Sequence, residues 1–161
     1  VLIRKSLPCR PAWSYTSEGG AAQLVWLGGC LIGSVYLAPN PDSIQVCEEV
    51  TQAMQSIRPH DTWLLGGDFN ATPDENPFLY TLEDLNSQCW NPSVPTRWSG
   101  DRCIDYFLGN MPPTSIVALE HVVADHYIVE SQVSLRLPIS KAWVQAPAAR
   151  LPSLSQLGCN E

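Results

Sequence analysis

Two short polar motifs, each placed after an apolar run, contain side chains that could do chemistry. The sequence is Gly-Gly-Asp-Phe-Asn at 66–70 and Asp-His at 125–126. The apolar runs before them predict buried strands, so each motif lies where a strand ends and a loop can carry function. Carboxylate and amide oxygens suit a hard cation such as Mg²⁺, and a histidine can hold or donate a proton. Together they indicate a metal-assisted attack on a phosphate ester, and the candidates are Asp68, Asn70, Asp125 and His126.

A third acidic residue, Asp105, lies in the apolar segment 103–108. A carboxylate in an apolar strand is costly to bury unless it is hydrogen-bonded or paired with a charge. We therefore expect a histidine partner, and His126 is the candidate. Taken alone, Asp68 and Asn70 would be interpreted as a polar turn that caps a strand. The ordered set of motifs favours the catalytic interpretation.

The elements that must position these side chains follow from the apolar periodicity. Two strands joined at Gly28-Gly29 are predicted within residues 22–37, because a Gly-Gly pair between apolar runs is typical of a hairpin. A helix is predicted over 43–58, with Asp42 as its N-cap and Pro59 as its stop. Its predicted inward face holds Ile44, Cys47, Val50, Met54 and Ile57.

In the second part of the chain, predicted strands outnumber predicted helices. A strand at 62–65 precedes the first motif, and a helix is predicted from Asn76 to about Leu85. Residues 86–101 look like a loop, and strands are predicted at 103–108, 115–123 and 128–137. This order indicates an α/β (α+β) domain, a mixed sheet with helices on one face.

Composition limits the classes of protein to consider. The chain has 161 residues and a net charge of −7, and it has no apolar run long enough to span a membrane. Residues 40–130 contain 14 acidic and three basic side chains, so they lack the basic stripe of a protein that grips a nucleic-acid backbone. The six cysteines have neither zinc-finger nor C-x-x-C spacing, which indicates reduced thiols in an intracellular protein, nuclear or cytoplasmic.

Four segments, in this order, resemble the endonuclease/exonuclease/phosphatase superfamily. They are Val35-Tyr36 with Pro39-Asn40, then Gly67-Asp68-Phe69-Asn70, then Ile104-Asp105-Tyr106-Phe107, then Asp125-His126. The superfamily includes deoxyribonuclease I, deadenylases, sphingomyelinases, inositol polyphosphate phosphatases and the endonucleases of non-LTR retrotransposons. The resemblance covers residues 20–137 and implies the C-terminal part of a four-layer α/β sandwich.

The resemblance implies a role for each matching residue. Asp68 would orient or deprotonate the attacking water, and Asn70 would hold Asp68 and the phosphate. His126 would stabilise the phosphoryl oxygens or the leaving group, with Asp105 orienting its ring. The resemblance implies a metal-dependent hydrolase of phosphoric esters. Within this class it implies a phosphodiesterase, in particular a nuclease, so nucleic acid would be the substrate of the parent protein.

The remaining implied contacts are to metal and substrate. Asp68 would serve Mg²⁺, or Mn²⁺ in its place, and Asp125 would serve either the metal or the base role. Tyr36 would contact the phosphate. Core packing is nearly as good an interpretation of Tyr36. Trp98, in its loop, is the best candidate among the six tryptophans to stack on a base.

One part of the superfamily pattern has no counterpart in this sequence. The family begins with a strand that carries an Asn and, further on, a Glu that is its principal metal ligand, whereas the only acid before Tyr36 is Glu18, in a turn-like Ser-Glu-Gly-Gly. We therefore expect a poorly defined segment at 1–19, a partial domain at 20–137 and a linker or disordered tail at 138–161. For the same reason we expect that an N-terminal half or fused domains are missing. We also expect the isolated fragment to be inactive.

Two other functions stay open at this point. The chain could be a phosphomonoesterase or phospholipase of the same superfamily, of the inositol polyphosphate phosphatase or sphingomyelinase type, because nothing in the sequence selects the substrate. It could also be a non-catalytic remnant or a binding module, because the Glu-bearing part is absent.

Overall fold

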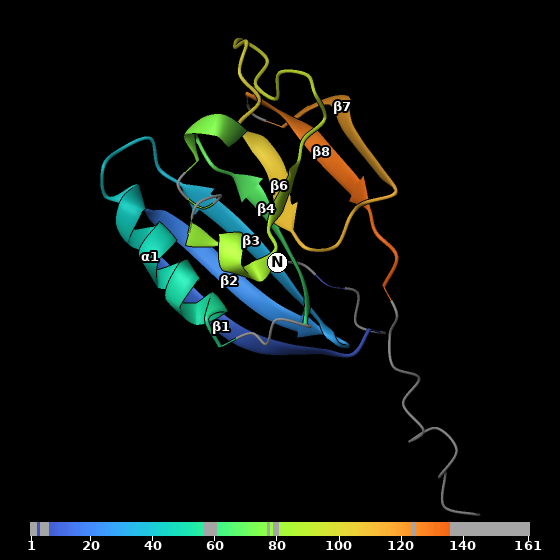
Figure 1. The fold of residues 1–161 in the computed structure, drawn as a ribbon. Coiled ribbons are helices and arrows are strands. Elements are labelled where there is room, and N and C mark those ends of the chain that lie inside the picture. Colours follow the sequence, from blue (N-terminus) through green and yellow to red (C-terminus); the bar gives the residue numbers. More distant parts are fainter. Residues whose placement is uncertain are drawn as a thin grey trace, which may run out of the picture.

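The computed structural model describes residues 3, 7–56, 61–76, 78, 81–123 and 125–135. These residues form a six-stranded sheet, a separate two-stranded sheet and the helix α1 (Ser43–Met54), with two short 3₁₀ helices (Figure 1). The strands are β1 (Cys9–Ser17), β2 (Gly20–Leu27), β3 (Cys30–Leu37), β4 (Thr62–Asp68), β5 (Gln88–Trp90), β6 (Asp105–Gly109), β7 (Ser115–Val123) and β8 (His126–Gln132). The 3₁₀ helices are Pro73–Glu75 and Glu83–Leu85.

The large sheet is mixed, as the order of elements in the sequence predicts. Its strand order is β1-β2-β3-β4-β6-β5. β3 and β4 are parallel and are connected through α1, whereas every other neighbouring pair in this sheet is antiparallel. The predicted hairpin at Gly28-Gly29 is confirmed, since Leu27 pairs with Cys30 across it. Gly28 has φ 63°, a left-handed conformation that glycine adopts without strain.

The helices cover one face of this sheet. In Figure 1, α1 lies over β1 and β2, and the orange hairpin β7–β8 lies on the other side of the sheet. Strand alternation sends every second side chain of β3 and β4 towards the helices, where they are buried with α1. The largest buried side chains there are Trp63, Tyr106, Phe69, Phe78, Leu24, Leu31, Met54, Leu65, Leu82 and Leu108.

Helix α1 begins at Ser43 with Asp42 at the N-cap position, as predicted, but it is shorter than predicted and its buried face differs. Its buried face is Val46, Cys47, Val50 and Met54, whereas Ile44 is 58% exposed. At about 100° per residue, Ile44 lies about 100° from the centre of that face. Asp42 makes no capping hydrogen bond through its side chain, and the helix ends at Met54. The predicted Ile57 and Pro59 lie outside the described residues.

The second helix is described only in part. Asn76 accepts the backbone N–H of Phe78 through Oδ1 (2.9 Å), the contact expected of a cap, and the Leu82 N–H donates to the Phe78 carbonyl (2.9 Å). Asn76 is fully buried and also donates to the Tyr106 Oη (2.7 Å). These bonds fix the segment between β4 and β5 against the sheet, directly beneath the first polar motif.

Strand β1 lies in residues 1–19, which the sequence analysis described only as a poorly defined segment and in which it predicted no strand. Cys9–Ser17 pairs along the whole of β2, with an irregularity between Pro11 and Trp13. Most of its side chains are exposed, and apolar alternation is confined to Trp13 and Tyr15, which pack against the core. The two prolines flanking Cys9 suit an edge strand, where an N–H can be missing from the ladder.

The other strands agree with their predictions to different degrees. β7 matches its predicted 115–123, β6 begins two residues later than expected, and β8 runs from His126 to Gln132 where 128–137 was expected. β5 lies in the segment 86–101 that was predicted as a loop. No helix of the described residues is long and apolar enough to cross a membrane. The five cysteines in this part of the chain are all free thiols, and the predicted tail at 138–161 lies outside it.

Candidate active site

The six-stranded sheet brings three of the candidate residues together at one end of its strands. β3 and β4 run in parallel and end together, so Tyr36 pairs in register with Asp68. β6 runs the opposite way and begins at this end, which places Asp105 opposite Asp68 on the other side. His126 begins β8, on the second sheet.

The Asp-Phe-Asn sequence positions its side chains by alternation. Phe69 points into the helix-covered core, where it is 1% exposed and stacks on the Tyr106 ring at 4.5 Å between centroids. Its backbone N–H donates to the Ile104 carbonyl (2.9 Å). Because neighbouring residues of an extended chain face opposite ways, an inward Phe69 turns Asp68 outward, away from that core.

Asn70 ends the motif in a left-handed conformation, with φ 49°. Asparagine tolerates this conformation better than most side chains. Its Nδ2 donates to the Leu37 carbonyl at the end of β3 (2.6 Å), and its backbone N–H donates to Asp68 Oδ1 (2.9 Å). Asn70 therefore ties the ends of β3 and β4 together and holds the Asp68 carboxylate.

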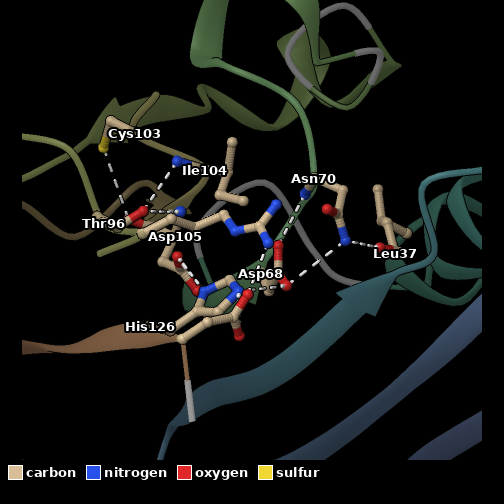
Figure 2. A network of polar contacts seen from close by, with 10 residues as sticks. Leu37, Asp68, Asn70, Thr96, Cys103, Ile104, Asp105 and His126 are labelled. Atoms are coloured by element: carbon tan, nitrogen blue, oxygen red, sulfur yellow. Dashed lines mark hydrogen bonds and ion pairs between the residues drawn. The ribbon is translucent and has the colours of Figure 1, made fainter. Parts of the chain in front are cut away.

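The His126 imidazole lies between two carboxylates, as Figure 2 shows. Its Nδ1 is 2.9 Å from Asp105 Oδ2, and its Nε2 is 3.9 Å from Asp68 Oδ2. All three side chains are largely buried, with 25% of His126, 19% of Asp68 and 17% of Asp105 exposed. With a proton on Nδ1, the ring donates to Asp105 and its Nε2 faces Asp68.

Burial raises the pKa of the Asp68 carboxyl, and the nearby Asp105 charge adds to this effect. The hydrogen bond from the Asn70 N–H and the charges of His126 and Arg97 act in the opposite direction. Asp68 and Asp105 both line a cleft of about 340 Å³ on the outer face of β3, β4 and β6, which Tyr127 of β8 closes on one side. A reacting group could enter beside them.

Asp125 is placed differently from the other candidates. It is 52% exposed, and its Oδ2 is 2.6 Å from Arg97 Nη2, while its Oδ1 is 3.6 Å from His126 Nε2. The hydrogen bond from Arg97 lowers the pKa of its carboxyl. The structure therefore engages Asp125 with Arg97 through one oxygen and places the other oxygen beside His126 Nε2, slightly nearer than Asp68 Oδ2 at 3.9 Å.

Tyr36 and Trp98 flank this centre with exposed aromatic rings. Tyr36, beside Asp68 in the register, is 47% exposed, and Trp98 is 70% exposed. Trp98 lines a second pocket of about 390 Å³ together with Val94, Arg97 and Tyr127. Tyr127 lines both this pocket and the cleft at Asp68.

Asp68, Asp105 and His126 could hold a metal ion, because each offers a ligand atom and these atoms lie within 4.8 Å of one another. Mg²⁺ is commonly bound through one or two carboxylates, with water and substrate phosphate in its other positions. The cluster fits this requirement, since a cation would offset the cost of ionising a buried Asp68 beside Asp105. One oxygen of Asp105 is already engaged by His126.

Sequence analysis missed two residues that contact this cluster, Thr96 and Arg97. Thr96 is fully buried, and its Oγ1 accepts the backbone N–H groups of Ile104 (3.0 Å) and Asp105 (3.1 Å). Both residues lie in a segment without apolar periodicity, which was predicted only as a loop. A small hydroxyl residue directly after a proline was the single available signal, and that signal is common in loops.

No model of a protein family matches this sequence, and no curated protein does. Among solved structures, the endonuclease domain of TRAS1, a telomere-specific non-LTR retrotransposon, superposes with a TM-score of 0.59 at 19% identity, over 76% of this chain and 64% of that chain. CdtB, the biologically active subunit of cytolethal distending toxin, gives 0.58 at 18% identity, over 77% of this chain and 56% of that one. The cytolethal distending toxin of Haemophilus ducreyi superposes with a TM-score of 0.55 at 20% identity, over 79% of this chain and 58% of that chain.

These similarities establish the fold. The mixed sheet with helices on one face was predicted from the order of elements, and it is consistent with the deoxyribonuclease I-like α/β fold that the four motifs imply. The chain spans between 56% and 64% of the length of the three structures named above.

Proposed function

We propose that this chain carries the phosphate-handling residues of a Mg²⁺-dependent phosphodiesterase that cleaves nucleic acid. The observation that carries the proposal is the position of His126, with Nδ1 on Asp105 and Nε2 towards a buried Asp68. The fold supports it, because a solved structure with this fold is an endonuclease domain.

The pair of His126 and Asp105 would act on the phosphoryl oxygens. Asp105 accepts the Nδ1 proton and so fixes both the tautomer and the orientation of the ring. When protonated, Nε2 can donate to a phosphoryl oxygen or give its proton to the leaving oxygen. Tyr36, exposed at the same end of the strands, would contact the phosphate from the β3 side.

Asp68 would orient the attacking water and accept its proton. Burial strengthens Asp68 as a base, because it raises the pKa of the carboxyl, and Asn70 holds the carboxylate in place through its backbone N–H. Asp68, with the Asp105 oxygen that His126 leaves free, would hold Mg²⁺. When bound, this ion would stabilise the negative charge that develops on the phosphate.

A nucleic acid fits this site better than a small phosphomonoester does. Trp98 presents an exposed ring beside a pocket that shares Tyr127 with the cleft, so a base next to the reacting phosphate could stack there. An inositol phosphate has no aromatic face to occupy this pocket.

The test uses the natural polypeptide that contains these residues, incubated with Mg²⁺ and a labelled oligonucleotide. We expect Asp68→Asn and His126→Asn each to lower the cleavage rate by about 10²–10⁴-fold, the range of general acid–base catalysis. Asp74→Asn, which changes an exposed acid in the same loop, is the matched control and should cleave normally. Equal cleavage by Asp68→Asn and the unmodified protein would refute the assigned site.

The 161-residue chain should be assayed in parallel, together with a soluble phosphomonoester and a sphingomyelin substrate. We expect no useful rate of hydrolysis from this chain, because the cluster offers few oxygen ligands and the superfamily's principal metal-binding Glu has no counterpart before Tyr36. Turnover of the phosphomonoester by the natural polypeptide, without cleavage of nucleic acid, would favour the phosphatase alternative. Rapid Mg²⁺-dependent hydrolysis by the 161-residue chain would contradict the expectation of inactivity.

A further inference from the structure

We propose that Thr96 is a positioning residue that sets the geometry of the His126–Asp105 pair. Asp105 belongs to β6 in the six-stranded sheet, whereas His126 belongs to β8 in the two-stranded sheet. The two residues are therefore not neighbours in one ladder, and something else must fix the 2.9 Å contact between them.

The Thr96 hydroxyl holds the Asp105 side of the pair. Its Oγ1 accepts the N–H groups of both Ile104 and Asp105, at 3.0 and 3.1 Å (Figure 2). These N–H groups come directly at the start of β6, where the backbone turns into the strand. Because Thr96 is fully buried, water cannot replace the hydroxyl as their acceptor.

The Thr96 backbone holds the His126 side. Its carbonyl accepts the Tyr127 N–H (2.9 Å), and the Trp98 N–H donates to the Asp125 carbonyl (3.0 Å). Between these two bonds, Arg97 and His126 form an antiparallel bridge. Residues 96–98 therefore lie alongside the first residues of β8 as a short additional strand.

One residue is thus bonded to the backbone beside each member of the pair. If the hydroxyl is removed, the start of β6 loses its acceptor and can move relative to β8, while the Thr96 carbonyl stays bonded to Tyr127. The distance between Nδ1 and the Asp105 carboxylate depends on that relative position. The Thr96 hydroxyl should therefore control the His126 tautomer.

The ¹⁵N NMR spectrum of the imidazole side chains measures this property directly. The chain has three histidines, and the His126 signals are those lost in His126→Asn. At a pH where the ring is neutral, we expect the unmodified chain to carry its proton on Nδ1, with a strongly downfield ¹H resonance for the Nδ1–H proton. Thr96→Val should lose this resonance and show a mixture of tautomers, whereas Thr96→Ser should retain it.

The matched control is Tyr106→Phe, which removes the hydroxyl that accepts from Asn76. This buried residue adjoins Asp105 in β6, so its loss destabilises the same strand without changing the acceptor at Thr96. We expect it to keep the His126 signature. If Thr96→Val does not fold, Thr96→Cys replaces the hydroxyl by a weaker acceptor of similar size.

Two results would overturn the proposal: an unchanged His126 spectrum in folded Thr96→Val or Thr96→Cys, or a loss of the signature in Thr96→Ser. The effect on catalysis rests on the proposed function, and the spectrum does not. In the natural polypeptide, Thr96→Val should cleave at least about tenfold more slowly, with rescue by Thr96→Ser. If Thr96→Val loses the His126 signature and Thr96→Ser keeps it, but neither the unmodified polypeptide nor any variant hydrolyses nucleic acid, the proposed function is rejected. The positioning role of Thr96 would then still stand.

Discussion

The Asp68 carboxyl lies among groups that act on its protonation in opposite directions. Burial and the Asp105 charge favour the neutral acid, while the Asn70 N–H, His126 and Arg97 favour the carboxylate. The first effect is the larger, so the folded protein raises the pKa of this group above its value in the unfolded chain. A raised pKa suits a base, and it also means that ionised Asp68 destabilises the fold.

We expect Asp68→Asn to be more stable than the unmodified chain at neutral pH. Because the pKa of Asp68 is higher in the folded state, folding is penalised at any pH above the folded pKa, and the penalty disappears below the unfolded pKa of about 3.9. Thermal unfolding at pH 7 and at acidic pH measures the difference. An equal gain in Tm at both pH values would contradict this cause, and Asp74→Asn serves as the exposed control.

The pKa of the Asp125 carboxyl is shifted in the opposite direction to that of Asp68. The hydrogen bond from Arg97 lowers the pKa of its carboxyl, so any stability from this pair is present above the unfolded pKa and lost as the pH falls through the folded one. Both side chains are about half exposed, so solvent and salt weaken the interaction.

At the scale of elements, the site depends on how closely β4 approaches β3. A Cβ on Gly67 would lie 1.7 Å from the Val35 carbonyl oxygen, which belongs to the backbone of the neighbouring strand. Only glycine fits at this position, directly before Asp68. The glycine in the motif therefore allows the parallel pairing that aligns Tyr36 with Asp68.

We expect Gly67→Ala to destabilise the protein by more than about 2 kcal/mol, because the clash involves backbone that cannot rotate away. Gly29→Ala is the matched control, since a Cβ there would meet nothing within 4 Å. Urea unfolding of both variants measures the difference in the free energy of unfolding. Similar stabilities for the two variants would show that β3 and β4 can separate without cost.

At the scale of the whole molecule, the proposed nucleic-acid substrate must approach an acidic protein. The net charge is −7, and two of the three arginines in residues 40–130 are paired with acids, Arg97 with Asp125 and Arg102 with Glu75. Long-range attraction of phosphates is therefore weak, and binding must rely on short-range contacts at the cleft and on stacking at Trp98.

We expect binding of a single-stranded oligonucleotide to the natural polypeptide carrying Asp68→Asn to depend weakly on salt. A protein that neutralises few phosphates should give a slope of log K against log[salt] of magnitude below about 3. Trp98→Ala should weaken binding by about tenfold, within the range for loss of one base stack. Fluorescence anisotropy between about 50 and 200 mM salt measures both. A steep slope would indicate a basic surface outside the described residues.

The sequence alone determined the local features of the site. Gly-Gly pairs, apolar runs and Asx residues act over a few neighbouring residues, so the hairpin at Gly28 and the strands before and after the two motifs could be predicted. The expected pairing of Asp105 with His126 followed from the cost of burying a carboxylate, and the structure places their side chains 2.9 Å apart. The roles of these residues, the domain limits and the compartment remain predictions.

Apart from the pair of Asp105 and His126, tertiary structure alone decided which polar groups meet between distant segments. In β1 the apolar alternation is limited to Trp13 and Tyr15, and its pairing with β2 defines the strand. Thr96 lies in an irregular segment, and its importance comes from bonds to Asp105 and Tyr127, which lie nine and 31 residues further along the chain. The arginine partner of Asp125 is likewise distant in sequence. Such contacts depend on how separate elements pack, and packing is set by the whole chain, so no local pattern encodes them.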